Sequence, residues 1–163
     1  MNSLHIREAT ERDTPVILEF ILRLADYERL SHLVVATEQS LRAHLFGPRP
    51  VAEVMLAEWD GQPAGFMLFF HNFSTFLGQP GIYLEDLFVN PDMRGRGIGK
   101  ALLARLASIA WARGCGRLEW AVLNWNESSI GFYKSLGAVP MDEWTVYRVT
   151  GDALRRLADG ARA

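Results

Sequence analysis

The chain has 163 residues, of which 49% are hydrophobic and 22% charged, and its formal net charge is −2. This length and balance predict one globular domain over residues 1–163, and the charge excludes an overall basic surface for nucleic acid. The charged N-terminal stretch is unlike a signal peptide, no apolar run approaches the roughly 20 residues of a membrane span, and a single cysteine cannot form an internal disulfide. We therefore expect no membrane association and a cytoplasmic location.

The first half of the chain predicts two helices between strands. Residues 3–9 alternate as a strand, and Asp13-Thr14-Pro15 has the composition of a helix start. Residues 37–47 form a second, short helix that Thr37 caps. Two apolar strands follow, residues 51–58 and 63–73, and the tight turn at Asp60-Gly61 joins them into a hairpin.

The second half begins with a strand over residues 81–89, which Asn90-Pro91 ends. An amphipathic helix then runs from the glycines at 95–99 to Gly114. After this helix we expect a strand over 117–123 and a helix over 126–137. A last strand over 143–149 and a polar tail with helical character over 150–163 follow. This order predicts the α/β (α+β) class, with a mixed sheet and helices on both of its faces.

The stretch "MRGRGIGKALL", residues 93–103, has the glycine content of a loop that binds an anion at a helix N-terminus. An ATP-binding loop needs a longer glycine spacing and a hydroxyl after the lysine, where this chain has Ala101. A dinucleotide loop needs G-x-G-x-x-G near the start of a βαβ unit, whereas Gly95, Gly97 and Gly99 lie deep in the chain and give G-x-G-x-G. Both alternatives are therefore weak. A glycine-rich strand-to-helix turn without any ligand is the simpler interpretation, but the number of specified positions and the correct flanking strand and helix argue against it.

The same residues resemble the acetyl-CoA loop of the GNAT acyltransferases, Q/R-x-x-G-x-G/A, with Arg94, Gly97 and Gly99 at the specified positions. The stretches "YLEDLFVNPDMRGRGIG" and "NWNESSIGFYKSLGA" resemble, in addition, the spermidine/spermine (diamine) acetyltransferase subgroup. This resemblance extends from about Ile6 to Val149. It implies a GNAT fold: a twisted, mostly antiparallel sheet flanked by helices, with a V-shaped opening for acetyl-CoA. It also implies a homodimer, often formed through the C-terminal strand, here residues 143–149.

The resemblance implies that acetyl-CoA contacts the strand before the loop, the loop itself and the helix at 126–137. Backbone groups of the strand and loop would close around the pyrophosphate, with the helix dipole behind them. The residues at these positions are Leu87, Phe88, Val89, Arg94, Gly95, Arg96, Gly97, Ile98, Gly99, Lys100, Asn126, Ser129 and Tyr133.

The resemblance assigns the chemistry to two residues: Tyr133 from this set, and Glu85, which lies two residues before Leu87. A phenol with its ordinary pKa of about 10 is protonated at neutral pH, so Tyr133 can protonate the departing thiolate. An alkylammonium must lose a proton before it attacks, and the subgroup uses the glutamate at Glu85 as the base, through water. The simpler interpretations are a core tyrosine at 133 and, at 85, a carboxylate paired with an arginine. Asp86 follows Glu85 on the strand, so we expect the two side chains on opposite faces.

A site for a diamine should be acidic, and the candidate substrate residues are Tyr27, Glu28, Glu85, Asp86, Glu119 and Phe76. Phe76 belongs to "NFSTFLGQPG", which departs from the subgroup because it has Ser74-Thr75-Phe76 where polyamine enzymes carry Asp-Pro-Trp. Without that aspartate, short diamines, lysine or a thia-analogue of lysine become as plausible as long polyamines.

The resulting hypothesis is an acetyl-CoA-dependent N-acetyltransferase that acts on a primary amine of a small diamine, polyamine or lysine-like molecule. Two alternatives stay open: an acetyltransferase for protein N-termini or lysine side chains, and a non-catalytic acyl-CoA-binding regulatory domain. The four histidines show no metal-ligand spacing, so we expect no metal.

Overall fold

The computed structural model describes residues 3–162, which fall into two compact units, one ending at Leu123 and one beginning at Asn124. The first unit holds all the strands and three helices, in the order β1 (Leu4–Glu8), α1 (Thr14–Tyr27), α2 (Glu38–Leu45), β2 (Glu53–Trp59), β3 (Gln62–Ser74), β4 (Gln79–Val89), α3 (Ile98–Ala112) and β5 (Leu118–Trp120). The second unit holds α4 (Glu127–Ser135) and α5 (Gly151–Asp159). Residue 163, the end of the predicted tail, lies outside the described residues.

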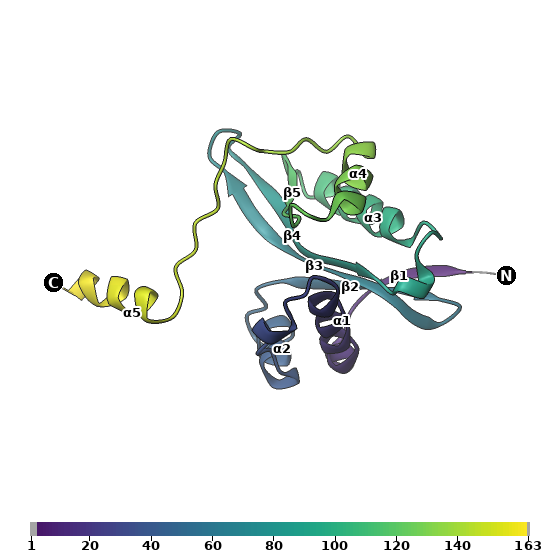
Figure 1. The fold of residues 1–163 in the computed structure, drawn as a ribbon, viewed down its shortest axis with the longest axis horizontal. Coiled ribbons are helices and arrows are strands. Elements are labelled where there is room, and N and C mark those ends of the chain that lie inside the picture. Colours follow the sequence, from purple (N-terminus) through teal and green to yellow (C-terminus); the bar gives the residue numbers. More distant parts are fainter. Residues whose placement is uncertain (1–2, 163) are drawn as a thin grey trace. The chain divides into compact units, whose positions relative to one another are not determined.

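The five strands form one open sheet in the order β1-β2-β3-β4-β5. The first three pairs are antiparallel, and β4 and β5 are parallel. Helices α1 and α2 lie on one face of this sheet, and α3 lies on the other (Figure 1). The predicted mixed, mostly antiparallel sheet with helices on both faces is therefore confirmed.

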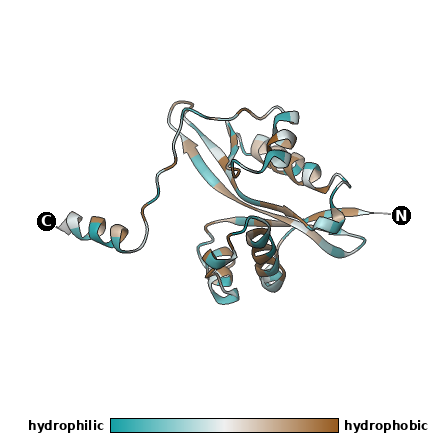
Figure 2. Cartoon of the chain, in the orientation of Figure 1, coloured by the Kyte–Doolittle hydropathy of each residue, from teal (hydrophilic) through white to brown (hydrophobic). Residues whose placement is uncertain are grey.

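The core on the α1 face explains why this helix packs against the middle of the sheet. Ile17 and Phe20, three residues apart and so on one side of the helix, are fully or almost fully buried. The ring of Phe20 stacks on Phe66 of β3 at 5.4 Å and lies tilted against Phe88 of β4 at 6.0 Å. Figure 2 shows hydrophobic residues along α1. This packing places the C-terminal end of α1 beside β4.

The local signals predicted from sequence are present where they were expected. Pro15 lies in the first turn of α1. The Thr37 hydroxyl accepts a hydrogen bond from the Ser40 amide at 3.1 Å, which caps α2. The strands β2 and β3 pair through the predicted turn at Asp60-Gly61. No helix in the part of the chain that the structure describes is long and apolar enough to cross a membrane.

Two predicted strands differ from the structure. The strand expected over 117–123 is shorter, with only β5 regular. The strand expected over 143–149 is wrong for the described chain, in which these residues form no strand. Their large apolar side chains are exposed: Trp144, Val146, Tyr147 and Val149. A strand requires a hydrogen-bonded neighbour, and its alternating pattern alone does not provide one.

Candidate active site

The middle of β4 carries a β-bulge at Glu85. Leu68 of β3 pairs with Asp86, and the next β3 residue, Phe69, pairs with Leu84, so Glu85 has no partner on β3. Paired residues share a face of the sheet, so Leu84 and Asp86 lie on opposite faces although they are two residues apart. The regular alternation that predicts opposite faces for Glu85 and Asp86 is therefore broken at this point.

The bulge also marks the place where β4 and β5 separate. Their parallel pairing covers only Ile82–Leu84 of β4 and Leu118–Trp120 of β5. From Glu85 to Val89 the edge of β4 that faces away from β3 has no strand partner among the described residues. Leu87, Phe88 and Val89, the predicted cofactor strand, belong to this stretch, whose outward backbone groups have no strand partner. The Val89 carbonyl oxygen accepts a hydrogen bond from the Arg94 side chain.

Three carboxylates, those of Glu28, Glu85 and Asp86, lie close together where α1 ends beside β4. Burial, followed by the charges of Glu85 and Glu28, raises the pKa of Asp86 to about 6. Burial also raises the pKa of Glu28, which caps the C-terminal end of α1. Across residues 3–162, none of these three carboxylates makes a hydrogen bond or ion pair through its side chain. The alternative of Glu85 paired with an arginine is therefore excluded.

Glu119, the fourth predicted carboxylate of the substrate site, has a different environment. Its Oε1 lies 2.8 Å from Arg117 Nε and accepts a hydrogen bond from Asn72 Nδ2 at 3.1 Å. Burial, followed by the charges of Glu85 and Glu119, raises the pKa of Tyr83. Because Arg117 already neutralises it, Glu119 is a weaker partner for a substrate cation than the three unpaired carboxylates.

The glycine loop has the geometry of an anion-binding turn. Gly95 (φ 75°) and Gly97 (φ 80°) adopt left-handed backbone conformations, which other residues reach only with strain, and Gly97 immediately precedes α3. Gly99 is ordinary helix, and a Cβ there would meet only Val89 Cγ2 at 3.8 Å. The fold alone thus leaves room for a side chain at residue 99, and the close approach of a ligand would explain its absence. Ile98 is buried beneath the loop, whereas Lys100 is exposed.

Arg94 connects the loop to the end of α1. Its Nε donates to the Val89 carbonyl oxygen at 3.1 Å, and its guanidinium lies 4.7 Å from the centre of the Tyr27 ring. Arg96, two residues on, lies over the ring of Trp59 at 5.3 Å. A predicted substrate residue, Tyr27, and a predicted cofactor residue, Arg94, are therefore in contact.

Phe76 lies apart from this cluster. It is 96% exposed and lies in the turn that joins β3 to β4, between the paired residues Ser74 and Gln79. At about 3.3 Å per strand residue, the turn is roughly 20 Å from Glu85 along β4. Within this unit, Phe76 does not take part in the site formed by Tyr27, Glu28, Glu85 and Asp86.

The remaining predicted residues belong to the second unit. The Asn126 side chain accepts a hydrogen bond from the Ser129 amide at 3.3 Å and so caps α4, as predicted. Tyr133 lies in the same helix, with its ring 5.5 Å from that of Phe132.

Sequence reasoning missed two residues that hold the site in place, Asn90 and its partner Arg23. Asn90 is almost completely buried; its Oδ1 accepts from Arg23 of α1 at 3.0 Å, and its Nδ2 donates to the Pro63 carbonyl oxygen at 3.2 Å. These bonds tie α1, β3 and the end of β4 together directly before the loop. The only sequence signal was Asn90-Pro91, which predicted the end of the strand but no partner for the amide.

The profile of the Acetyltransferase (GNAT) family matches residues 18–138. A thialysine N-epsilon-acetyltransferase of Mus musculus is 40% identical over 169 residues, which cover 97% of this chain and 99% of that protein. The L-ornithine N5-acetyltransferase NATA1 of Arabidopsis thaliana is 36% identical over 93% of this chain and 86% of that protein. A spermidine/spermine N(1)-acetyltransferase-like protein 1 of Homo sapiens is 30% identical over 97% of this chain and 24% of that protein.

Among solved structures, an integron cassette protein from the mobile metagenome of V. cholerae superimposes with a TM-score of 0.80. It is 30% identical, and the match covers 96% of this chain and 98% of that one. The matched residues include β4 with its bulge, the glycine loop and α4. The chain therefore belongs to the acetyltransferase (GNAT) family and is an N-acetyltransferase related to the diamine subgroup, as its motifs predict.

Proposed function

We propose that this enzyme transfers the acetyl group of acetyl-CoA to the side-chain amine of a small lysine-like amino acid or a short diamine, by direct attack of the amine. The observation that carries the proposal is the cluster of three unpaired carboxylates beside the glycine loop: Glu28, Glu85 and Asp86. Glu28 and Asp86 are half-buried and Glu85 is exposed. Unpaired carboxylates favour a cation, and an alkylammonium is the cation that an N-acetyltransferase takes.

The residues present fit acetyl-CoA. The open edge of β4 offers backbone groups at Leu87 and Val89, and the left-handed turn at Gly95 and Gly97 leads into the N-terminus of α3, which favours an anion. The room beside Gly99 is consistent with a ligand close to the backbone. When bound, acetyl-CoA supplies the activated acyl group, and the loop holds its phosphates.

Glu85 and Asp86 would prepare the amine. The ammonium loses a proton to the Glu85 carboxylate, through water, and the free lone pair then forms the new N–C bond while the C–S bond breaks. Asp86 and Glu28 hold the positive charge nearby, and Tyr27 forms one wall of the site against Arg94. Because Asp86 has a pKa of about 6 before an amine binds, it is mostly ionised at neutral pH and available for a cation.

Tyr133 would supply the other proton, to the sulfur that leaves. The protons then balance: the nitrogen gives up two, one to Glu85 before the attack and one after it that restores the phenol once Tyr133 has protonated the thiolate. The products are an amide and a thiol, with one proton left on Glu85. We also infer that residues 1–163 act as one domain. The family profile runs from 18 to 138 across the boundary between the two units, which supports a single site that includes both Glu85 and Tyr133.

The substrate class is proposed from the relatives and from the sequence of the β3–β4 turn. The names of two relatives specify thialysine and L-ornithine, amino acids with a side-chain amine. In this chain the turn lacks the Asp-Pro-Trp that its resemblance associates with long polyamines. The second, distant ammonium of a long polyamine therefore has no carboxylate partner in this turn. A single side-chain amine, in contrast, has Glu28, Glu85 and Asp86 as partners.

The direct test measures thiol release from acetyl-CoA with thialysine, L-ornithine, L-lysine, a short diamine, spermidine and a peptide with a free N-terminus. We expect the highest kcat/KM for the amino acids with a side-chain amine or for the short diamine. Preference for the peptide would favour a protein acetyltransferase. Binding of acetyl-CoA without turnover of any amine would favour a regulatory domain.

The acid is tested with Tyr133→Phe, and Tyr147→Phe on an exposed tyrosine is the matched control. We expect Tyr133→Phe to lower kcat by about 100-fold with acetyl-CoA affinity unchanged, since a positioned acid contributes about that much. An unchanged kcat at intact acetyl-CoA affinity would assign the proton to another group.

We further propose a homodimer in which residues 143–149 pair as a strand with a second copy. The support is the exposed apolar pattern of Trp144, Val146 and Val149 and the outer edge of β5, which has no strand partner among the described residues. Light scattering should give twice the mass of one chain. Val146→Lys should lower that mass, whereas Arg155→Lys in α5 should not. A wild-type protein with the mass of one chain would contradict the proposal.

A further inference from the structure

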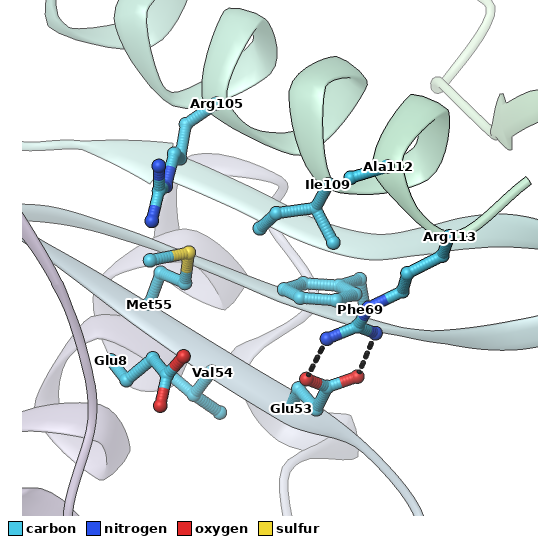
Figure 3. Close-up of a pocket in the computed structure, with 9 residues that line it drawn as sticks. All are labelled: Glu8, Glu53, Val54, Met55, Phe69, Arg105, Ile109, Ala112 and Arg113. Atoms are coloured by element: carbon cyan, nitrogen blue, oxygen red, sulfur yellow. Dashed lines mark hydrogen bonds and ion pairs between the residues drawn. The ribbon is translucent and has the colours of Figure 1, made fainter.

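A cavity lies on the α3 face of the sheet, beneath the C-terminal half of this helix. Its volume is about 150 Å³, and all its lining residues belong to the first unit. Figure 3 shows Ile109 of α3 and Phe69 of β3 pointing into it, with Met55 of β2 beside them. Met55 and Phe69 are almost completely buried, so the floor of the cavity is apolar. None of these residues belongs to the site of the proposed acetyl transfer.

Four charged side chains surround this floor: Glu8, Glu53, Arg105 and Arg113. Glu53 and Arg113 satisfy each other through two hydrogen bonds of 2.6 and 2.7 Å, the dashed lines of Figure 3. Glu8 of β1 and Arg105 of α3 make no side-chain hydrogen bond or ion pair within residues 3–162. Figure 3 shows Arg105 extending from α3 towards the strands and the Glu8 carboxylate near Met55. The cavity thus offers one cation and one anion that still lack a partner.

These charges determine which ligand fits. The four formal charges sum to zero, so the cavity as a whole favours neither an anion such as phosphate nor a simple cation. Arg113 is a poor phosphate ligand because Glu53 occupies its guanidinium; its pKa is raised chiefly by that bond, and the charge of Glu8 contributes further. A zwitterion can satisfy both unpaired groups at once, with its carboxylate on Arg105 and its ammonium on Glu8.

The volume sets the size of the apolar part. A cavity of this volume accommodates a benzene-sized apolar group, which corresponds to one aliphatic side chain. We propose that the cavity between β1, β2, β3 and α3 is a second ligand site that binds a free α-amino acid with an aliphatic side chain. The α-carboxylate binds Arg105, the α-ammonium binds Glu8, and the side chain lies on Met55, Phe69 and Ile109.

L-Leucine is the probe, and its binding to the full chain is measured by calorimetry and by amide chemical shifts. For a ligand of this size with two charge-assisted contacts, we expect a Kd of about 1 mM. The analogues 4-methylpentanoate and 3-methylbutylamine each lack one charge and should bind about 10-fold more weakly. Inorganic phosphate should not compete. The absence of leucine binding up to about 20 mM, or displacement by phosphate, would overturn the proposal.

Variants locate the binding. Arg105→Gln and Glu8→Gln each remove the charge of an exposed side chain, and each should weaken leucine binding about 10-fold, whereas Arg155→Gln in α5 should not change it. Asp86→Asn distinguishes this cavity from the proposed acetyl-acceptor site and should leave leucine binding unchanged. Loss of leucine binding in Asp86→Asn would place the amino acid at the acetyl-acceptor carboxylates and refute a second site. Retained leucine binding by an enzyme without acetyl transfer would refute only the proposed function.

Discussion

The first unit contains two groups of acidic side chains with opposite surroundings. Asp13 and Glu58 both bind Arg7, at 2.8 Å each, and this contact lowers the pKa of both carboxylates. Glu28, Glu85 and Asp86 have no such cation, and burial with mutual repulsion raises the pKa of Asp86. The first group holds β1, β2 and the start of α1 together. The second group destabilises the folded state when no ligand is bound, as is common for sites that bind a charged ligand.

The largest expected effect concerns the unpaired group. Glu85→Gln should lower kcat/KM for the amine about 100-fold, because the amide cannot accept the ammonium proton. Glu38→Gln, on an exposed helix of the same unit, is the matched control and should change it less than about twofold. Steady-state rates over a pH range provide the measurement. If Glu85→Gln behaves like Glu38→Gln, the unpaired group has no catalytic role.

The ion pairs of Arg7 with Asp13 and Glu58 should contribute to the free energy of unfolding. Arg7→Met should lower the free energy of unfolding by about 2 kcal/mol at pH 7, because it leaves two carboxylates without their partner. Asp13 has a lowered pKa in the folded state, so its ion pair stabilises above the ordinary pKa of 3.8 and is lost as the pH falls below it. Urea unfolding at pH 7 and pH 3 should therefore show a smaller difference between wild type and variant at pH 3. An equal difference at both pH values would contradict this assignment.

The smallest effect has the opposite sign. Asp86 has a raised pKa, so between its ordinary pKa of 3.8 and about 6 the folded state holds the proton more tightly, and wild-type stability falls as the pH rises through this range. Asp86→Asn removes the buried charge and should raise the free energy of unfolding at pH 7.5 by about 1 kcal/mol while it lowers activity. At pH 3.5 the gain should vanish. Loss of stability at pH 7.5 would show that Asp86 is structural.

Sequence periodicity predicted most elements because their signals are local. Thr37 caps α2 through a residue three positions away, and Asn126 caps α4 in the same way. The glycine loop was equally predictable, since its left-handed conformations depend on the residues that adopt them. The segment 143–149 failed because strand formation depends on a neighbour that its own residues do not specify.

The sequence by itself thus determined the family, the glycine loop and the residues that carry the proposed acid and base. Only the tertiary structure decided which carboxylates are available. Glu85, Asp86 and Glu119 look alike in the chain, yet Arg117 neutralises Glu119, while a bulge and the end of α1 place Glu85, Asp86 and Glu28 together without a cation. The physical reason is that a charge is paired or unpaired according to side chains distant in sequence, and their positions follow from the packing of α1 on the sheet.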